Sequence, residues 1–126
     1  MESYQNAVRS FMIAFGQNAP DKLDMENYPF GLRADLVIEE ASEFCRACEM
    51  QDKVQMIDAI CDLLYVTYGA AVAMGVDIDR FFWEVHRSNM SKLDPTTGAP
   101  IYRDDGKVLK PSTYSPPDIA GILNSM

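Results

Sequence analysis

Five carboxylates stand on two otherwise apolar helical segments, and this pattern constrains the fold more than any other feature of the chain. Glu39, Glu40 and Glu43 lie on the first segment, and Asp58 and Asp62 lie on the second. A charge removed from water without a partner is costly, and like charges brought together add repulsion. A fold that gathers these acids therefore needs a counter-charge, and a divalent cation is the simplest one.

The spacing of apolar side chains predicts four helices, over about residues 3–16, 32–50 and 53–74 and then from about residue 77 onward. Gly16 and Gly75 are typical helix stops. Short connections between such helices favour a bundle. The third segment is apolar around its whole circumference from Ile57 to Met74, which predicts a central, buried helix with no solvated face for Asp58 and Asp62.

The character of the chain changes after Leu93. Two short apolar runs flank Asp104-Asp105-Gly106, which indicates a small hairpin, and prolines then indicate an extended tail with one helical turn near 119–123. We therefore predict an all-α fold, a four-helix bundle with a short C-terminal hairpin and extended tail. Residues 1–126 form one domain in this prediction, with a helical core at about 3–93 and a tail at 94–126.

Composition excludes several classes of function. The chain of 126 residues has a formal net charge of −8 and a pI of about 4.4, so it lacks the basic surface that grips a nucleic acid polymer. The apolar run from Ile57 to Val76 is interrupted by Asp58, Asp62 and Gly69, which argues against a membrane span. The N-terminal residues lack the layout of a signal peptide. We expect a cytoplasmic protein without a membrane partner.

Three cysteines, Cys45, Cys48 and Cys61, include a C-x-x-C pattern. A zinc site needs a second such pair or several histidines, and His86 is the only histidine in the sequence. A redox C-x-x-C belongs at a helix start, whereas Cys45 falls late in a helical pattern. We therefore expect small, mostly buried thiols in a reducing compartment.

The two acidic segments follow each other through a turn near Gln51, so their helices are expected to be antiparallel neighbours. Glu39 and Glu43 would then face Asp58 and Asp62 across the helix pair. Carboxylate ligands without histidine favour magnesium or manganese over redox iron. The alternative for the three glutamates taken alone is an ordinary solvated acidic face.

Magnesium in proteins usually works together with substrate phosphates, so basic groups are expected near the acids. The chain concentrates such groups from the fourth helix onward, where Asn89 adds a neutral hydrogen-bonding side chain: Arg87, Lys92, Arg103, Lys107 and Lys110. Each of these cations alone is more often a solvated surface charge. Their grouping in an acidic protein favours a phosphate-binding role.

At this point the residues resemble a known family. Glu39-Glu40-x-x-Glu43 followed by Asp58-x-x-x-Asp62-Leu-Leu-Tyr is similar to the signature of the all-α nucleoside triphosphate pyrophosphohydrolases, the MazG-like superfamily. The run 84–93, with its Ser-Asn-x-Ser-Lys element, resembles a single-domain subgroup found in phages and bacteria, as does the tail around Tyr102 to Val108. The superfamily includes dimeric dUTPases and phosphoribosyl-ATP pyrophosphohydrolase.

The resemblance implies hydrolysis of a nucleotide between its α and β phosphates, giving a monophosphate and pyrophosphate. It implies that two or three Mg²⁺ or Mn²⁺ ions are held by the five acids: Glu39, Glu40, Glu43, Asp58 and Asp62. One of the three glutamates is expected to activate the attacking water. Nucleotide-binding roles are expected for Asn89, Lys92, Arg87, Lys107 and Gln17.

Several alternatives stay open at this stage. The family often has glutamate where this chain has Gln55, which leaves the number of ions open. A guanine deoxynucleotide is our expected substrate, with dUTP or phosphoribosyl-ATP as alternatives. A non-catalytic helical oligomer that binds a partner is the competing class. The apolar surface of the third helix predicts a homodimer or homotetramer. If the chain is phage-encoded, we expect it in the host cytoplasm.

Overall fold

The computed structural model describes residues 2–126 and divides into two compact units, residues 1–78 and 79–126. The first unit contains α1 (Tyr4–Ala14), α2 (Phe30–Met50) and α3 (Lys53–Met74). The helix α4 (Ile78–Met90) begins at the last residue of the first unit and otherwise belongs to the second unit. The all-α class, with four main helices and a short C-terminal hairpin, is confirmed. That the two units form one domain stays a prediction.

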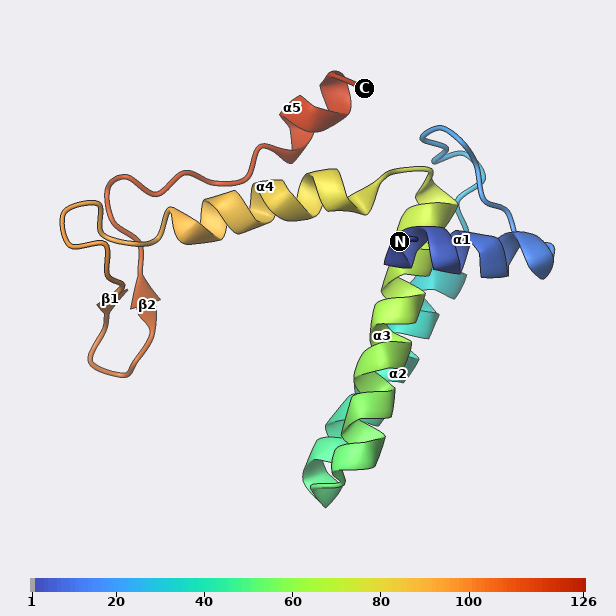
Figure 1. Ribbon diagram of the computed structural model, residues 1–126, viewed down its shortest axis with the longest axis horizontal. Coiled ribbons are helices and arrows are strands. Elements are labelled where there is room, and N and C mark those ends of the chain that lie inside the picture. Colours follow the sequence, from blue (N-terminus) through green and yellow to red (C-terminus); the bar gives the residue numbers. More distant parts are fainter. Residues whose placement is uncertain (1) are drawn as a thin grey trace. The chain divides into compact units, whose positions relative to one another are not determined.

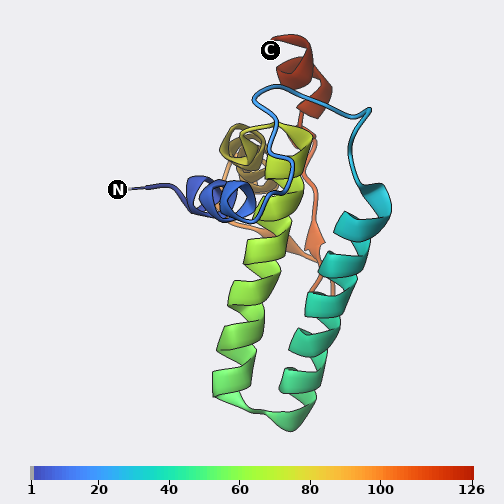
Figure 2. The same ribbon diagram turned by 90° about the vertical axis from the view of Figure 1, so that its right-hand side faces the viewer.

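An antiparallel pair of long helices dominates the first unit (Figures 1 and 2). The turn between α2 and α3 is tight because Gln51 adopts a left-handed conformation, with φ 53°, at the end of α2. Asp52 then caps α3: its carboxylate accepts hydrogen bonds from the backbone N–H groups of Val54 and Gln55, at 3.1 and 3.2 Å. This two-residue turn places the acidic stretches of both helices side by side.

The core of the first unit lies where α1 crosses α3 (Figure 2). Val8 and Met12 of α1 pack against Val72 and Ala73 near the end of α3, and all four are buried. The Gln5 side chain secures the segment after α3, because its amide donates to the Val76 carbonyl at 2.6 Å and its oxygen accepts from the Ile78 N–H at 3.0 Å. The core therefore holds one end of the α2–α3 pair.

The prediction that α3 is a central, buried helix is wrong for this chain alone. Ile57 is 63% exposed and Leu64 is 53% exposed, and Val54, Ile60 and Tyr65 are also exposed. The physical reason is geometric: α2 covers one side of α3 and α1 crosses one end, so much of the circumference has no covering element. Asp58 is exposed and Asp62 is half-buried, so these acids do have access to water.

The apolar character of α3 also bears on membrane insertion. By length and composition α3 is the one described helix capable of crossing a membrane, a weak indication because core helices meet the same criteria.

The expectation of mostly buried thiols is wrong as well: Cys45 and Cys61 are exposed, and Cys48 is half-buried.

In the second unit, a hairpin and a tail follow α4. The strands β1 (Ile101–Tyr102) and β2 (Val108–Leu109) pair antiparallel, with Ile101 opposite Leu109, as the turn residues predicted. The tail ends in the short helix α5 (Ile119–Asn124), near the predicted helical turn. Ser91, just after α4, accepts a hydrogen bond from the Ser115 N–H at 2.9 Å, which anchors the tail.

Candidate metal centre

Three carboxylates meet between α2 and α3. Glu40 and Glu43 come from α2 and Asp62 comes from α3, and each offers an oxygen within 4.8 Å of the other two. We call Glu40, Glu43 and Asp62 the three-acid group. Glu40 and Glu43 share a helix face because three residues separate them by almost one turn. The antiparallel hairpin then brings Asp62 to the same level.

Glu40 contributes a buried carboxylate oxygen to this group. Its Oε2 is buried and has no hydrogen-bond partner among the described residues. Burial raises the pKa of Glu40 above its ordinary value, and the carboxylates of Glu43, Asp62, Glu39 and Asp58 raise it further, in that order. A buried carboxylate oxygen facing four other acids is the environment in which a bound cation provides the missing partner.

Glu39 and Asp58 lie close enough to influence Glu40 electrostatically but stand outside the three-acid group. Both are exposed. The argument for a metal rested mainly on Asp58 and Asp62, which were expected to have no solvated face, but Asp58 is exposed and Asp62 is half-buried. The carboxylate oxygen that is buried without a hydrogen-bond partner belongs to Glu40.

The donor set fits a hard divalent cation. It consists of carboxylate oxygens, and the three-acid group contains neither histidine nor cysteine. Magnesium and manganese prefer such oxygen ligands, whereas zinc and redox iron favour sites with nitrogen or sulfur. Gln55 lies exposed in the first turn of α3, where its N–H is capped by Asp52. An amide there adds no charge to the site.

Three of the predicted nucleotide-binding residues of the second unit, Arg87, Asn89 and Lys92, have side-chain partners within that unit. Arg87 donates to both carboxylate oxygens of Glu84, at 2.8 and 2.9 Å, and to the Pro116 carbonyl. This pairing, with the Asp118 N–H, lowers the pKa of Glu84 to about 2. Lys92 donates to the side-chain oxygen of Asn89 at 3.0 Å, and Lys107 lies exposed after the hairpin turn. Their contact with a nucleotide stays a prediction.

Gln17, the remaining predicted nucleotide-binding residue, contacts Arg33, a side chain that the sequence analysis did not identify as functional. The oxygen of its carboxamide accepts a hydrogen bond from Arg33 Nη2 at 3.3 Å. Arg33 is only 7% exposed, on the face of α2 that looks toward α3. A usable signal was present: Arg33 precedes Glu40 by seven residues, two helical turns, and so shares its face.

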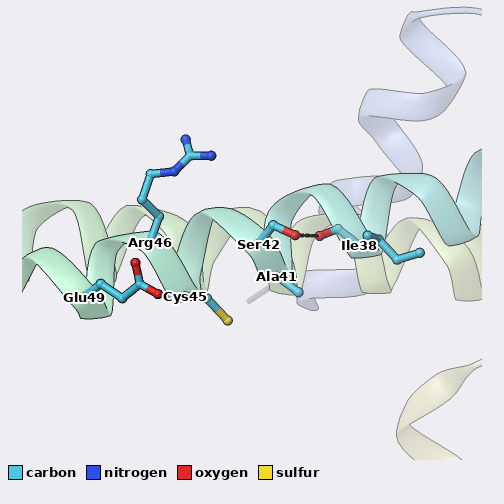
Figure 3. A pocket seen from close by; sticks show the side chains of 6 residues that line it. All are labelled: Ile38, Ala41, Ser42, Cys45, Arg46 and Glu49. Atoms are coloured by element: carbon cyan, nitrogen blue, oxygen red, sulfur yellow. Dashed lines mark hydrogen bonds between the residues drawn. The ribbon is translucent and has the colours of Figure 1, made fainter.

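Two hollows mark other surfaces of the helix pair. One, of about 460 Å³, follows a single face of α2 and is lined by six of its residues (Figure 3): Ile38, Ala41, Ser42, Cys45, Arg46 and Glu49. The other, of about 330 Å³, lies between the two helices and is almost wholly apolar, lined by Phe44, Ile60, Leu63, Leu64 and Thr67. Neither contains the three-acid group.

A protein-family model described as phosphoribosyl-ATP pyrophosphohydrolase matches residues 8–89, which include α2, α3 and all five acids. A search of curated proteins finds no match to the chain.

Proposed function

Because the chain belongs to the phosphoribosyl-ATP pyrophosphohydrolase family, we propose that it hydrolyses the anhydride between the α and β phosphates of a nucleotide triphosphate. The products are a nucleoside monophosphate and pyrophosphate. The observation that carries this proposal is the three-acid group, with the buried and unpartnered Glu40 oxygen, inside the matched range. A hydrolase of phosphoanhydrides needs a centre of this kind to offset the charge of its substrate.

In this proposal Glu40, Glu43 and Asp62 hold Mg²⁺ or Mn²⁺, and Glu39 and Asp58 extend the site to a second or third ion. When bound, these ions would lower the pKa of the attacking water, and their positive charge would offset the negative charge of the phosphates. Glu39, exposed and outside the three-acid group, is the glutamate we assign to accept the proton of the attacking water. Water oxygen bonds to the α phosphorus, the bond to the bridging oxygen breaks, and pyrophosphate leaves.

Two substrates deserve direct comparison. The description of the matching family names phosphoribosyl-ATP. The run 84–93 resembles a single-domain subgroup of the superfamily, and a guanine deoxynucleotide is the substrate that we expected from the sequence. Both molecules carry a triphosphate and would present the same anhydride to the acids. We propose that Lys92, Lys107, Arg87 and Asn89 contact the phosphates of either one.

The test is a substrate panel in which released pyrophosphate is measured. It contains the dNTPs, the NTPs, dUTP and phosphoribosyl-ATP, each with Mg²⁺, with Mn²⁺ and with excess chelator. We expect release from at least one nucleotide with either metal and none with chelator. Inorganic phosphate as the product would indicate cleavage at the γ phosphate, and failure to release pyrophosphate from every nucleotide would support the non-catalytic alternative.

We also propose that a second copy of the chain covers the exposed apolar face of α3, giving a homodimer or homotetramer. The support is the row of exposed apolar side chains, among them Val54, Ile57 and Leu64, beside the apolar hollow between the helices. Such a surface is unusual on a monomer. Sedimentation velocity should give at least twice the monomer mass of 14.1 kDa, and Ile57→Glu should shift the distribution toward monomer. A monomeric wild-type protein contradicts this proposal.

A further inference from the structure

Arg33 is a buried cation without a carboxylate partner among residues 2–126. It is 7% exposed, its Nε has no hydrogen-bond partner, and its one side-chain hydrogen bond among the described residues is the 3.3 Å bond to the Gln17 oxygen. A guanidinium held out of water in this way is costly. Because an apolar side chain would avoid this cost, we infer that the guanidinium of Arg33 has a role of its own.

Gly69 of α3 provides the space that Arg33 occupies. A Cβ at Gly69 would lie 2.8 Å from Arg33 Nη1, closer than side chains approach each other. Gly69 follows Asp62 by seven residues, just as Arg33 precedes Glu40 by seven. In the antiparallel pair this places Arg33 about 10 Å along the helix axis from the acids, on the same inner faces. A nucleotide whose phosphates lie at the acids would extend its sugar and base over a comparable length.

The chemistry of arginine fixes the orientation of Gln17. Arginine has only donors, so the carboxamide oxygen of Gln17 must face Arg33, and its NH₂ group is left to donate elsewhere. The backbone of Gln17 is held as well: its N–H donates to the Met12 carbonyl at 2.8 Å, while the Gly16 N–H donates to the Ile13 carbonyl at 3.1 Å. These two bonds form the Schellman end of α1. Gln17 is exposed, so its oriented NH₂ is accessible to a ligand.

We propose that Arg33 is a positioning residue that presents the Gln17 NH₂ as a donor to an oxo group of the nucleobase. The inference rests on the proposed function and names its substrate class: bases with an oxo group at the recognised edge, such as guanine or hypoxanthine. Adenine presents an amino group at the equivalent position. Two donors would then face each other, and both would lack an acceptor.

The variant Gln17→Glu tests this directly with dITP and dATP, whose bases carry oxo and amino groups at the same position. Glutamate keeps the shape and pairs with Arg33 but has no NH₂ to donate. We expect the wild-type kcat/KM for dITP to exceed that for dATP about tenfold or more, as for one discriminating hydrogen bond, and the variant to lose that ratio. Asn6→Asp, an exposed amide-to-acid change in α1, should leave the ratio unchanged.

Arg33→Lys supplies a second test, because lysine keeps the charge but lacks the planar fork that orients Gln17. We expect the dITP to dATP ratio to fall in this variant, whereas a purely structural role would lower both rates together. Equilibrium binding of dIMP and dAMP, measured by calorimetry, should show the same preference without turnover. If wild type releases pyrophosphate but treats the two nucleotides alike, or prefers phosphoribosyl-ATP, the inference fails while the proposed function stands. Absence of pyrophosphate from every nucleotide overturns both.

Discussion

Replacing Glu43 with alanine is expected to lower pyrophosphate release by at least about 100-fold while helix content is retained. Glu43 belongs to the three-acid group and is exposed, so its side chain contributes little to the hydrophobic core. Loss of groups that merely support a metal ligand already costs 10- to 100-fold, and loss of a ligand itself should cost at least about as much. Steady-state rates with saturating Mg²⁺ or Mn²⁺, beside circular dichroism, give the measurement.

In the absence of metal, we expect the same variant to be at least as stable as the wild-type protein. Without metal, removing one of several neighbouring carboxylates relieves repulsion at Glu40, so the melting temperature of Glu43→Ala should equal or exceed that of wild type. Added Mn²⁺ should raise the wild-type melting temperature more than that of the variant, because binding stabilises the folded state in proportion to affinity. Asp35→Ala, an exposed acid on α2, is the control. Full activity in Glu43→Ala would remove this residue from the site.

Replacing Gly75 with alanine is expected to lower the free energy of unfolding by about 3 kcal/mol or more, a loss typical of severe steric conflicts. Gly75 ends α3 in a left-handed conformation with φ 82°. An added Cβ would lie 2.1 Å from the Lys22 carbonyl oxygen, and this contact is to backbone, which cannot rotate away. The Asp24 N–H donates to the Met74 carbonyl at 2.9 Å, so the loop and helix end must separate to relieve the clash.

Gly16→Ala is the matched control for this prediction. Gly16 has φ 74°, but nothing lies within 4 Å of its added Cβ. It should therefore show only the cost of the left-handed conformation, about 1–2 kcal/mol. Urea denaturation of both variants measures the difference. Equal losses in the two would mean that the Lys22 contact relaxes freely and that only the backbone conformation matters.

Helix boundaries were the part of the fold most readily predicted, because the signals that set them are local. The third helix begins and ends where the sequence indicated, at Lys53 and Met74, since Asp52 caps one end and Gly75 the other. The second helix begins two residues before the predicted Leu32, after Pro29, where no side chain caps it. The hairpin pairing around Gly106 was likewise readable from its turn residues.

Burial was predicted less well, because it depends on which elements lie opposite each residue. The apolar circumference of α3 suggested complete burial, yet Ile57 and Leu64 are exposed where neither α1 nor α2 reaches. The same reasoning left Asp58 and Asp62 without a solvated face. The carboxylate oxygen that is buried without a partner belongs instead to Glu40.

The sequence by itself determined the helical segments, the set of candidate acidic ligands and the class of cation they suit, because periodicity, capping and ligand chemistry are properties of short stretches. Only the tertiary structure decided which carboxylate oxygens lie close together and which charged side chain, Arg33, is buried. The antiparallel register of α2 and α3 sets Glu40 and Glu43 against Asp62, and the gap at Gly69 admits Arg33 beside Gln17. These contacts join residues distant in the chain, so no local pattern encodes them.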